Sequence, residues 1–169
     1  MPYTFEESTP EALESLRKVL FGESVGYWYQ SEFKNRSGQA SGELIGGNLS
    51  LLLAVEGSVS EMNFDDRILF IEDVGEHEYA IDRMMRTWKR KGKLNKLKGL
   101  IVGAFNELGE ETIPFGQSPE EVIWELVKEY NYPVCFNFPT GHIADNRAMV
   151  LGAEIGLQVE GQDVNFNYK

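Results

Sequence analysis

Three short apolar runs alternate with two segments of helical periodicity in the middle of the chain. The runs are RILFIE (67–72), GLIVGAF (99–105) and PVCFNF (133–138), and runs of this length bounded by acids, Gly or Pro are typical of buried strands. Residues 76–91 and 118–130 lie between them and carry apolar side chains at helical spacing. The order predicts an α/β domain in which helices cover a largely parallel sheet.

The flanking segments add further elements to this centre. Residues 8–11 place hydroxyls, a proline and an acid at the start of a helix that we expect to end near Leu20. Residues 25–30 are rich in aromatic side chains and predict a strand, whereas residues 41–57 predict a strand, a glycine turn and a short helix. Residues 153–167 alternate as in a hairpin. We therefore expect a single domain with a β-rich periphery.

Both central helices present one apolar face, which is more typical of core packing than of a ligand site. The second helix begins with a capping box, because Ser118 is followed three residues later by Glu121, and Pro119 occupies the first helical position. The expected buried side chains are Ala80, Ile81, Met84, Met85 and Trp88 in the first helix, and Val122, Ile123, Leu126, Val127 and Tyr130 in the second.

The net charge of −11 argues against nucleic acid as a partner, because phosphates are repelled by an acidic surface. One local exception is the basic segment, residues 86–98, which holds seven of the sixteen Lys and Arg residues. It is interpreted as a solvated helix C-terminus whose cations suit the helix dipole, with a polyanion site as the alternative.

Cysteine content and hydropathy indicate in which cellular compartment the protein is expected. Cys135 is the only cysteine, and its apolar surroundings predict a buried thiol without a disulfide. The first residues lack the basic start and apolar run of a leader, and no stretch approaches a membrane span in length. These features favour a cytoplasmic protein with no membrane partner.

Two side chains at predicted strand ends are candidates for chemistry, because the loops at the carboxyl edge of an α/β sheet converge on one crevice. Glu72 closes the first apolar run, and His142, one of only two histidines, follows the third. A carboxylate against an imidazole makes a general base for a hydroxyl nucleophile. The alternatives are a surface histidine and an acid that only caps a helix, with Asp73 and Glu76 as the candidates for that cap.

No nucleophile, cofactor or metal site accompanies this couple in the sequence. The chain has no G-x-S-x-G elbow, and two S-x-x-K matches, at Ser15 and Ser31, are what chance allows for so short a pattern. His77 and His142 have no ligand spacing with each other or with a cysteine cluster. The glycines of residues 42–48 match no phosphate or dinucleotide motif, and permit tight turns or close backbone approach.

Four motifs taken together resemble the carboxyl-terminal domain of the LD-carboxypeptidase family of serine peptidases, which also contains the microcin immunity protein. They are GELIGGNLSLL (42–52), ILFIEDVGEHEYAIDRMM (68–85), GLIVGAF (99–105) and PTGHIADN (139–146), and the likeness runs from about residue 41 to 157. By motif, the acid of the family's catalytic triad falls on Glu72 and its base on His142.

The resemblance implies that residues 1–169 are the carboxyl-terminal domain of a longer enzyme, whose amino-terminal domain carries the nucleophilic serine and the oxyanion hole. This chain alone should then be inactive. The implied reaction releases a terminal D-amino acid from cytoplasmic muropeptides during peptidoglycan recycling, without a cofactor. A microcin-like hydrolase of aminoacyl-nucleotides and a non-catalytic binding or assembly module remain alternatives, and the family suggests a homodimer.

Overall fold

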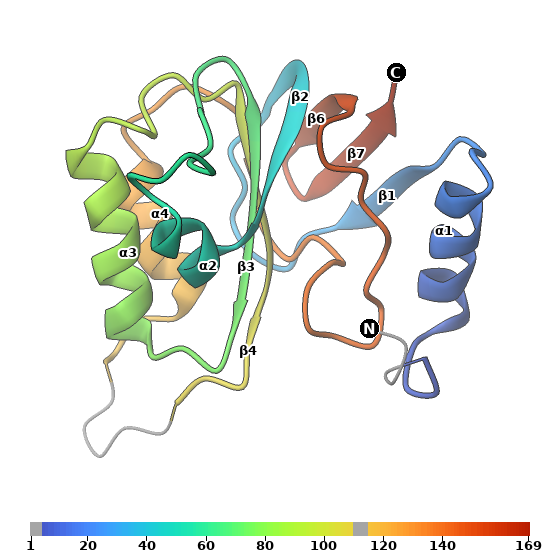
Figure 1. Cartoon of the computed structure of the whole chain (residues 1–169), viewed down its shortest axis with the longest axis horizontal. Helices are drawn as coiled ribbons and strands as arrows, with labels where there is room; N and C mark the ends of the chain where they lie inside the picture. The colour runs from blue at the N-terminus through green and yellow to red at the C-terminus, as the bar shows by residue number, and fades with distance from the viewer. Residues whose placement is uncertain (1–4, 110–114) are drawn as a thin grey trace.

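A seven-stranded mixed sheet organises residues 5–109 and 115–169, the part of the chain that the computed structural model describes (Figure 1). Its strand order is β1-β7-β6-β2-β3-β4-β5. The strands are β1 (Gly26–Gln30), β2 (Gly38–Asn48), β3 (Ile68–Val74), β4 (Gly99–Asn106), β5 (Val134–Cys135), β6 (Glu154–Glu160) and β7 (Asp163–Tyr168). The helices in the described residues are α1 (Pro10–Leu20), α2 (Leu49–Ala54), α3 (Glu78–Arg90) and α4 (Pro119–Val127).

Strand β2 joins two halves of different character. Its residues 38–43 pair antiparallel with β6, and its residues 44–48 pair parallel with β3. Strands β3, β4 and β5 continue the parallel half, and β1, β6 and β7 form an antiparallel periphery. The predicted α/β class, with a largely parallel central sheet, flanking helices and a β-rich periphery, is confirmed.

Two hydrophobic clusters hold these layers together. Helices α2, α3 and α4 cover one face of the parallel half (Figure 1), and the cluster between them contains all five apolar side chains predicted for α3. The second cluster joins the other face of β3 and β4 to the antiparallel strands through aromatic and branched side chains. Because both faces of β3 are covered, its residues 68–73 are all buried, including two carboxylates.

The capping signals act as the sequence predicts. Thr9 caps α1 by accepting a hydrogen bond from the backbone amide of Ala12. Ser118 and Glu121 form the reciprocal capping box of α4. On the predicted apolar face of α4, Tyr130 is partly buried and lies beyond the helix, which ends at Val127.

The predicted glycine turn within residues 41–57 is wrong. Gly46 and Gly47 continue β2, with φ angles of 136° and 142° that L side chains rarely adopt. A Cβ on Gly46 would collide with the backbone of Phe70 in the neighbouring strand. The glycine therefore permits close approach between β2 and β3, which was the second interpretation of this segment.

The third apolar run forms less strand than predicted. Only Val134 and Cys135 pair with β4 as a regular strand, and the chain then runs irregularly beside β4, where the amide of Phe138 donates to the carbonyl of Val102 at 3.0 Å. Within the described residues, no helix is both long enough and apolar enough to cross a membrane.

Candidate active site

Glu72 and His142 meet at one end of the parallel strands. The Nδ1 atom of His142 lies 2.8 Å from the Oε2 atom of Glu72, although the two residues are 70 positions apart in the chain. The side chain of Glu72 is 9% exposed, whereas that of His142 is 50% exposed. The two candidate side chains are therefore in contact, and of the two only the imidazole is open to solvent.

The geometry assigns different tasks to the two ring nitrogens. A carboxylate accepts only, so the neutral imidazole that contacts Glu72 carries its proton on Nδ1. The Nε2 atom then keeps its lone pair, and it makes no hydrogen bond with any described residue. Such a ring can take a proton from a hydroxyl group that approaches from solvent, and the carboxylate stabilises the resulting imidazolium.

The His142 loop, residues 139–148, is anchored on β4. The backbone amide of Ala104 donates to the carbonyl of Thr140 at 3.0 Å. A Cβ on Gly103 would collide with that carbonyl and with the ring of Phe70, so a glycine is needed where the loop crosses the strand. Gly141, with φ of 132°, passes close to Ala104 and to the carboxylate of Glu72.

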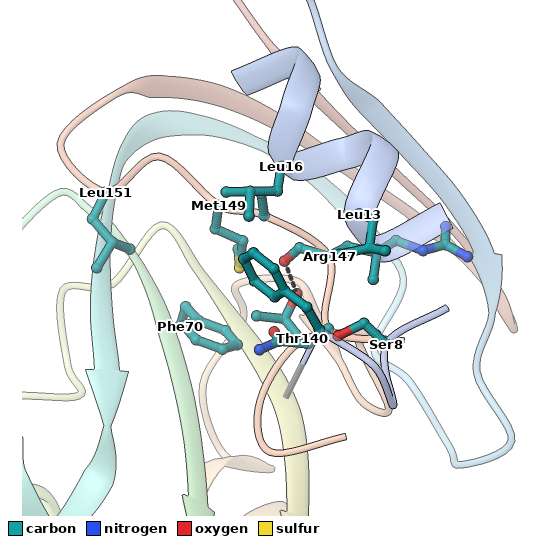
Figure 2. A pocket seen from close by; sticks show the side chains of 12 residues that line it. Ser8, Leu13, Leu16, Phe70, Thr140, Arg147, Met149 and Leu151 are labelled. Carbon is teal, nitrogen blue, oxygen red and sulfur yellow. Dashed lines mark hydrogen bonds between the residues drawn. The ribbon is translucent and has the colours of Figure 1, made fainter. Parts of the chain in front are cut away.

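The two ends of the loop are also tied to each other. The hydroxyl of Thr140 donates to the carbonyl of Arg147 at 2.9 Å (Figure 2), and the amide of Arg147 donates to the carbonyl of Pro139 at 2.9 Å. The side-chain oxygen of Asn146 accepts from the amide of Gly141 at 3.1 Å. These bonds present His142 on a closed turn. Sequence reasoning assigned no role to Gly103, Thr140 and Asn146, whose only signal was membership of the motifs GLIVGAF (99–105) and PTGHIADN (139–146).

Asp73, the neighbouring acid, has a structural role. It is 2% exposed and accepts hydrogen bonds from the side chain of Asn48 at 2.6 Å and from the backbone of Ser50 and Val74, both at 2.9 Å. Successive side chains of a strand point to opposite faces, so Asp73 joins β3 to the start of α2 while Glu72 faces His142. The helix after β3 has His77 as its N-cap, so neither Asp73 nor Glu76 is that cap.

The two serines of the S-x-x-K matches are hydrogen-bonded, and the Cys135 thiol is buried, as the sequence predicts. Ser15 is 5% exposed and bonds the backbone of Ala12 and Ala148, and Ser31 is 2% exposed and bonds Asn137. Burial raises the pKa of the Cys135 thiol to about 12. These three groups therefore offer no nucleophile near His142.

A cavity of about 310 Å³ lies between α1 and the His142 loop (Figure 2). Leu13, Leu16, Phe70 and Met149 give it apolar walls. His142 does not line it, so this cavity lies behind the loop rather than at the open side of the imidazole. Among the described residues, no group of three or more His, Cys, Asp or Glu side chains could hold a metal ion.

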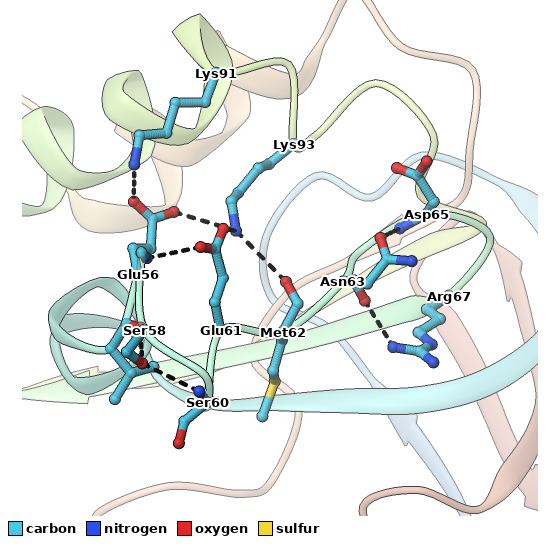
Figure 3. A network of polar contacts seen from close by, with 12 residues as sticks. Glu56, Ser58, Ser60, Glu61, Met62, Asn63, Asp65, Arg67, Lys91 and Lys93 are labelled. Atoms are coloured by element: carbon cyan, nitrogen blue, oxygen red, sulfur yellow. Dashed lines mark hydrogen bonds and ion pairs between the residues drawn. The ribbon is translucent and has the colours of Figure 1, made fainter.

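The basic segment, residues 86–98, is largely neutralised by acids of neighbouring elements. Figure 3 shows Lys91 and Lys93 on either side of Glu56, and Lys93 also lies 2.5 Å from Glu61. Glu56 is only 8% exposed. The remaining ion pairs of the segment are Arg86–Asp82, Lys89–Glu129 and Lys96–Asp65. Five of its seven cations are thus paired with acids among the residues that the structure describes, which leaves little positive potential for a polyanion.

Comparisons with known proteins agree with this geometry. The sequence profile of the LD-carboxypeptidase C-terminal domain matches residues 41–157, more than half of the chain. A probable murein peptide carboxypeptidase of Bacillus subtilis is 35% identical over 120 residues, which cover 71% of this chain and 38% of that protein. The microcin C7 self-immunity protein of Escherichia coli is 28% identical over 134 residues, or 76% of this chain and 37% of that protein.

A solved structure shows the same fold. The muramoyltetrapeptide carboxypeptidase of Oxalobacter formigenes matches with a TM-score of 0.85 at 24% identity, over 95% of this chain and 55% of that one. This chain thus spans about half or less of the length of these three proteins. The matched profile covers both Glu72 and His142. The chain belongs to the LD-carboxypeptidase family.

Proposed function

We propose that this chain is the acid–base half of a serine-type LD-carboxypeptidase that releases a terminal D-amino acid from muropeptides in the cytoplasm. The observation that carries the proposal is the contact between buried Glu72 and half-exposed His142. An amino-terminal domain would supply the serine and the oxyanion hole. Matched relatives of about twice this length are consistent with such a domain.

In the proposed reaction, His142 acts first as a base and then as an acid in each of two stages, acylation and deacylation of the serine. The Nε2 atom of His142 takes the proton of the serine hydroxyl as the serine oxygen attacks the scissile carbonyl carbon. When the C–N bond breaks, the imidazolium returns that proton to the departing amino group of the D-amino acid. Water then gives a proton to the same nitrogen as its oxygen attacks the acyl-serine ester, and the imidazolium returns that proton to the serine oxygen as the ester bond breaks. Glu72 holds the ring in the required tautomer throughout.

The test compares this chain with the protein in which an amino-terminal domain precedes it. D-alanine release from a muropeptide tetrapeptide is measured for both. The longer protein should turn over the substrate, and its His142→Ala variant should not. The isolated chain should be inactive, because an acid–base couple without a nucleophile and oxyanion donors forfeits most of the catalysis.

Two results would contradict the proposal. Turnover by the isolated chain, abolished by His142→Ala, would mean that the chain supplies its own nucleophile. A coding sequence that starts at Met1, with no domain upstream, would instead favour a free-standing binding or assembly module.

The second candidate function is hydrolysis of aminoacyl-nucleotides. The similarity to the microcin C7 self-immunity protein favours it, although that protein is less identical to this chain than the Bacillus subtilis relative. The same couple could serve either reaction, because both transfer an acyl group to a serine. Competing the tetrapeptide against an aspartyl-adenylate analogue in one assay decides between them.

The cytoplasmic location and a homodimer are part of the proposal. The buried single thiol suits a reducing compartment. Cell fractionation tests the first point, and sedimentation at several protein concentrations tests the second.

A further inference from the structure

We infer that Asn106 is a positioning residue for His142, because its side-chain amide fixes the backbone of the proposed base. The Nδ2 atom of Asn106 donates to the carbonyl oxygen of His142 at 2.6 Å. This inference rests on the proposed function for its consequence in catalysis, but the contact itself can be tested without any turnover.

Asn106 is held from behind by the sheet. It is the last residue of β4 and pairs in register with Val74 of β3. Its own carbonyl accepts a hydrogen bond from the amide of Gly75 at 3.1 Å. The amide group of Asn106 is therefore a short extension of a paired strand, and a side chain mounted on such an element is placed more accurately than one on a loop.

The contact of Asn106 lies at a part of the His142 loop that the other hydrogen bonds of the loop do not reach. The bonds of Thr140, Asn146 and Arg147 close the base of the loop. At the apex, the carbonyl of Ala144 accepts from the amide of Thr9 at 3.0 Å, and Asp145 accepts from the hydroxyl of Thr9 at 3.2 Å. Asn106 is the group among the described residues whose bond reaches the backbone of His142 itself.

The other end of the Asn106 amide is poorly satisfied. Its Oδ1 atom is buried and has no hydrogen-bond partner among the described residues. A buried acceptor without a partner lowers stability, so an asparagine is not the residue that packing alone would favour here. The cost is explained if the NH₂ group is required to hold the His142 carbonyl.

The consequence concerns the tautomer of the ring. Half-exposed His142 can rotate away from Glu72 unless its backbone is fixed, and only the geometry in contact with Glu72 keeps the proton on Nδ1. With the Asn106 bond lost, the ring should spend more time away from the carboxylate and carry its proton on Nε2 more often. That tautomer cannot accept the proton of a nucleophile.

Nitrogen-15 NMR of the imidazole rings in the isolated chain tests this directly. The chain has only two histidines, so His77 is an internal reference, and a His77→Gln variant assigns the signals. We expect the wild-type His142 ring, when neutral, to carry its proton mainly on Nδ1. In Asn106→Ala the ratio of the Nδ1–H to the Nε2–H form should fall about threefold to tenfold, as for loss of one hydrogen bond.

A second variant guards against misfolding. Asn106→Asp keeps the shape of the side chain but replaces the donor with an acceptor, so it should shift the tautomer ratio in the same direction as Asn106→Ala. Asn165→Ala, at a half-buried asparagine on β7, is the matched control and should leave the ratio unchanged. An unchanged ratio in both folded Asn106 variants would overturn the inference.

Kinetics in the longer protein supply the second readout. Asn106→Ala should lower kcat about tenfold and leave KM within about twofold, because the residue acts on the base and not on substrate binding. A rise in KM with unchanged kcat would overturn the positioning role. Absence of all turnover in the wild-type longer protein would count against the proposed function, whereas the NMR result would still decide the role of Asn106.

Discussion

The Glu72–His142 couple and the basic segment are both conspicuous in the sequence, yet the fold treats them in opposite ways. The couple joins two residues that are far apart in the chain, and the second ring nitrogen has no hydrogen-bond partner in the described part of the chain. The basic segment gathers seven cations within thirteen residues, and five of them form ion pairs with acids in residues 5–109 and 115–169. A candidate functional group is therefore indicated by a polar atom that is left without a hydrogen-bond partner after folding, rather than by the density of charge in the sequence.

The largest expected effect is at the couple. Glu72→Gln in the longer protein should lower kcat about 10²-fold to 10⁴-fold, since the ring loses the charge that stabilises the imidazolium. The midpoint of thermal unfolding should shift by no more than a few degrees, because the oxygen of the new side-chain amide can still accept a hydrogen bond from Nδ1 of His142. Steady-state kinetics beside a melting curve check both points, and a stability loss as large as the activity loss would make Glu72 a structural acid instead.

An intermediate effect on stability is expected in the basic segment. Glu56→Gln should reduce the free energy of unfolding by about 1–3 kcal/mol, because it removes the buried carboxylate that Lys91 and Lys93 share. Arg90→Gln is the matched control: it changes an exposed cation and should stay within about 0.5 kcal/mol. Urea unfolding followed by circular dichroism measures both. Equal effects would break the contrast between paired and unpaired cations in this segment.

A third expectation concerns pH, and it involves a group that lies outside both regions. Burial raises the pKa of Cys135 to about 12, so its thiol stays protonated in the folded chain at a pH where the unfolded chain would ionise it. Over that pH range the folded state binds more protons than the unfolded state. The contribution of the Cys135 thiol to the free energy of unfolding is therefore fully present below about pH 9, and it is lost as the pH rises toward 12. Chemical denaturation at pH 7, 9 and 10.5 should show a falling midpoint. Cys135→Ala should flatten that fall, and an identical fall in the variant would assign it to buried tyrosines such as Tyr29.

The smallest expected effect is on polyanion binding. Most cations of the basic segment are paired with acids in the described part of the chain, and the net charge of the chain is −11. We therefore expect no retention on immobilised heparin at an ionic strength of about 0.15 M. Binding that weakens steeply with added salt, and that a Lys96→Gln, Lys98→Gln double variant reduces, would restore the polyanion hypothesis.

Much of the fold could be predicted because its signals are local. The helix faces, the capping box of Ser118 and the first two apolar runs depend on residues within one or two turns of each other, and these appear in the structure, whereas the third run forms only the two-residue strand β5. The glycine turn was predicted wrongly because the reason for a glycine at position 46 is its close approach to the backbone of Phe70 in the neighbouring strand. The candidate couple was found from strand ends and a family motif, whereas Asn106 carried no local signal.

The sequence by itself determined the α/β alternation, the buried faces and the positions of the candidate acid and base, because periodicity and capping are properties of neighbouring residues. Only the tertiary structure decided that Glu72 turns toward His142 while Asp73 turns away, and that the basic segment is neutralised. Those outcomes depend on strand register and on packing between distant segments, which no short window of residues contains.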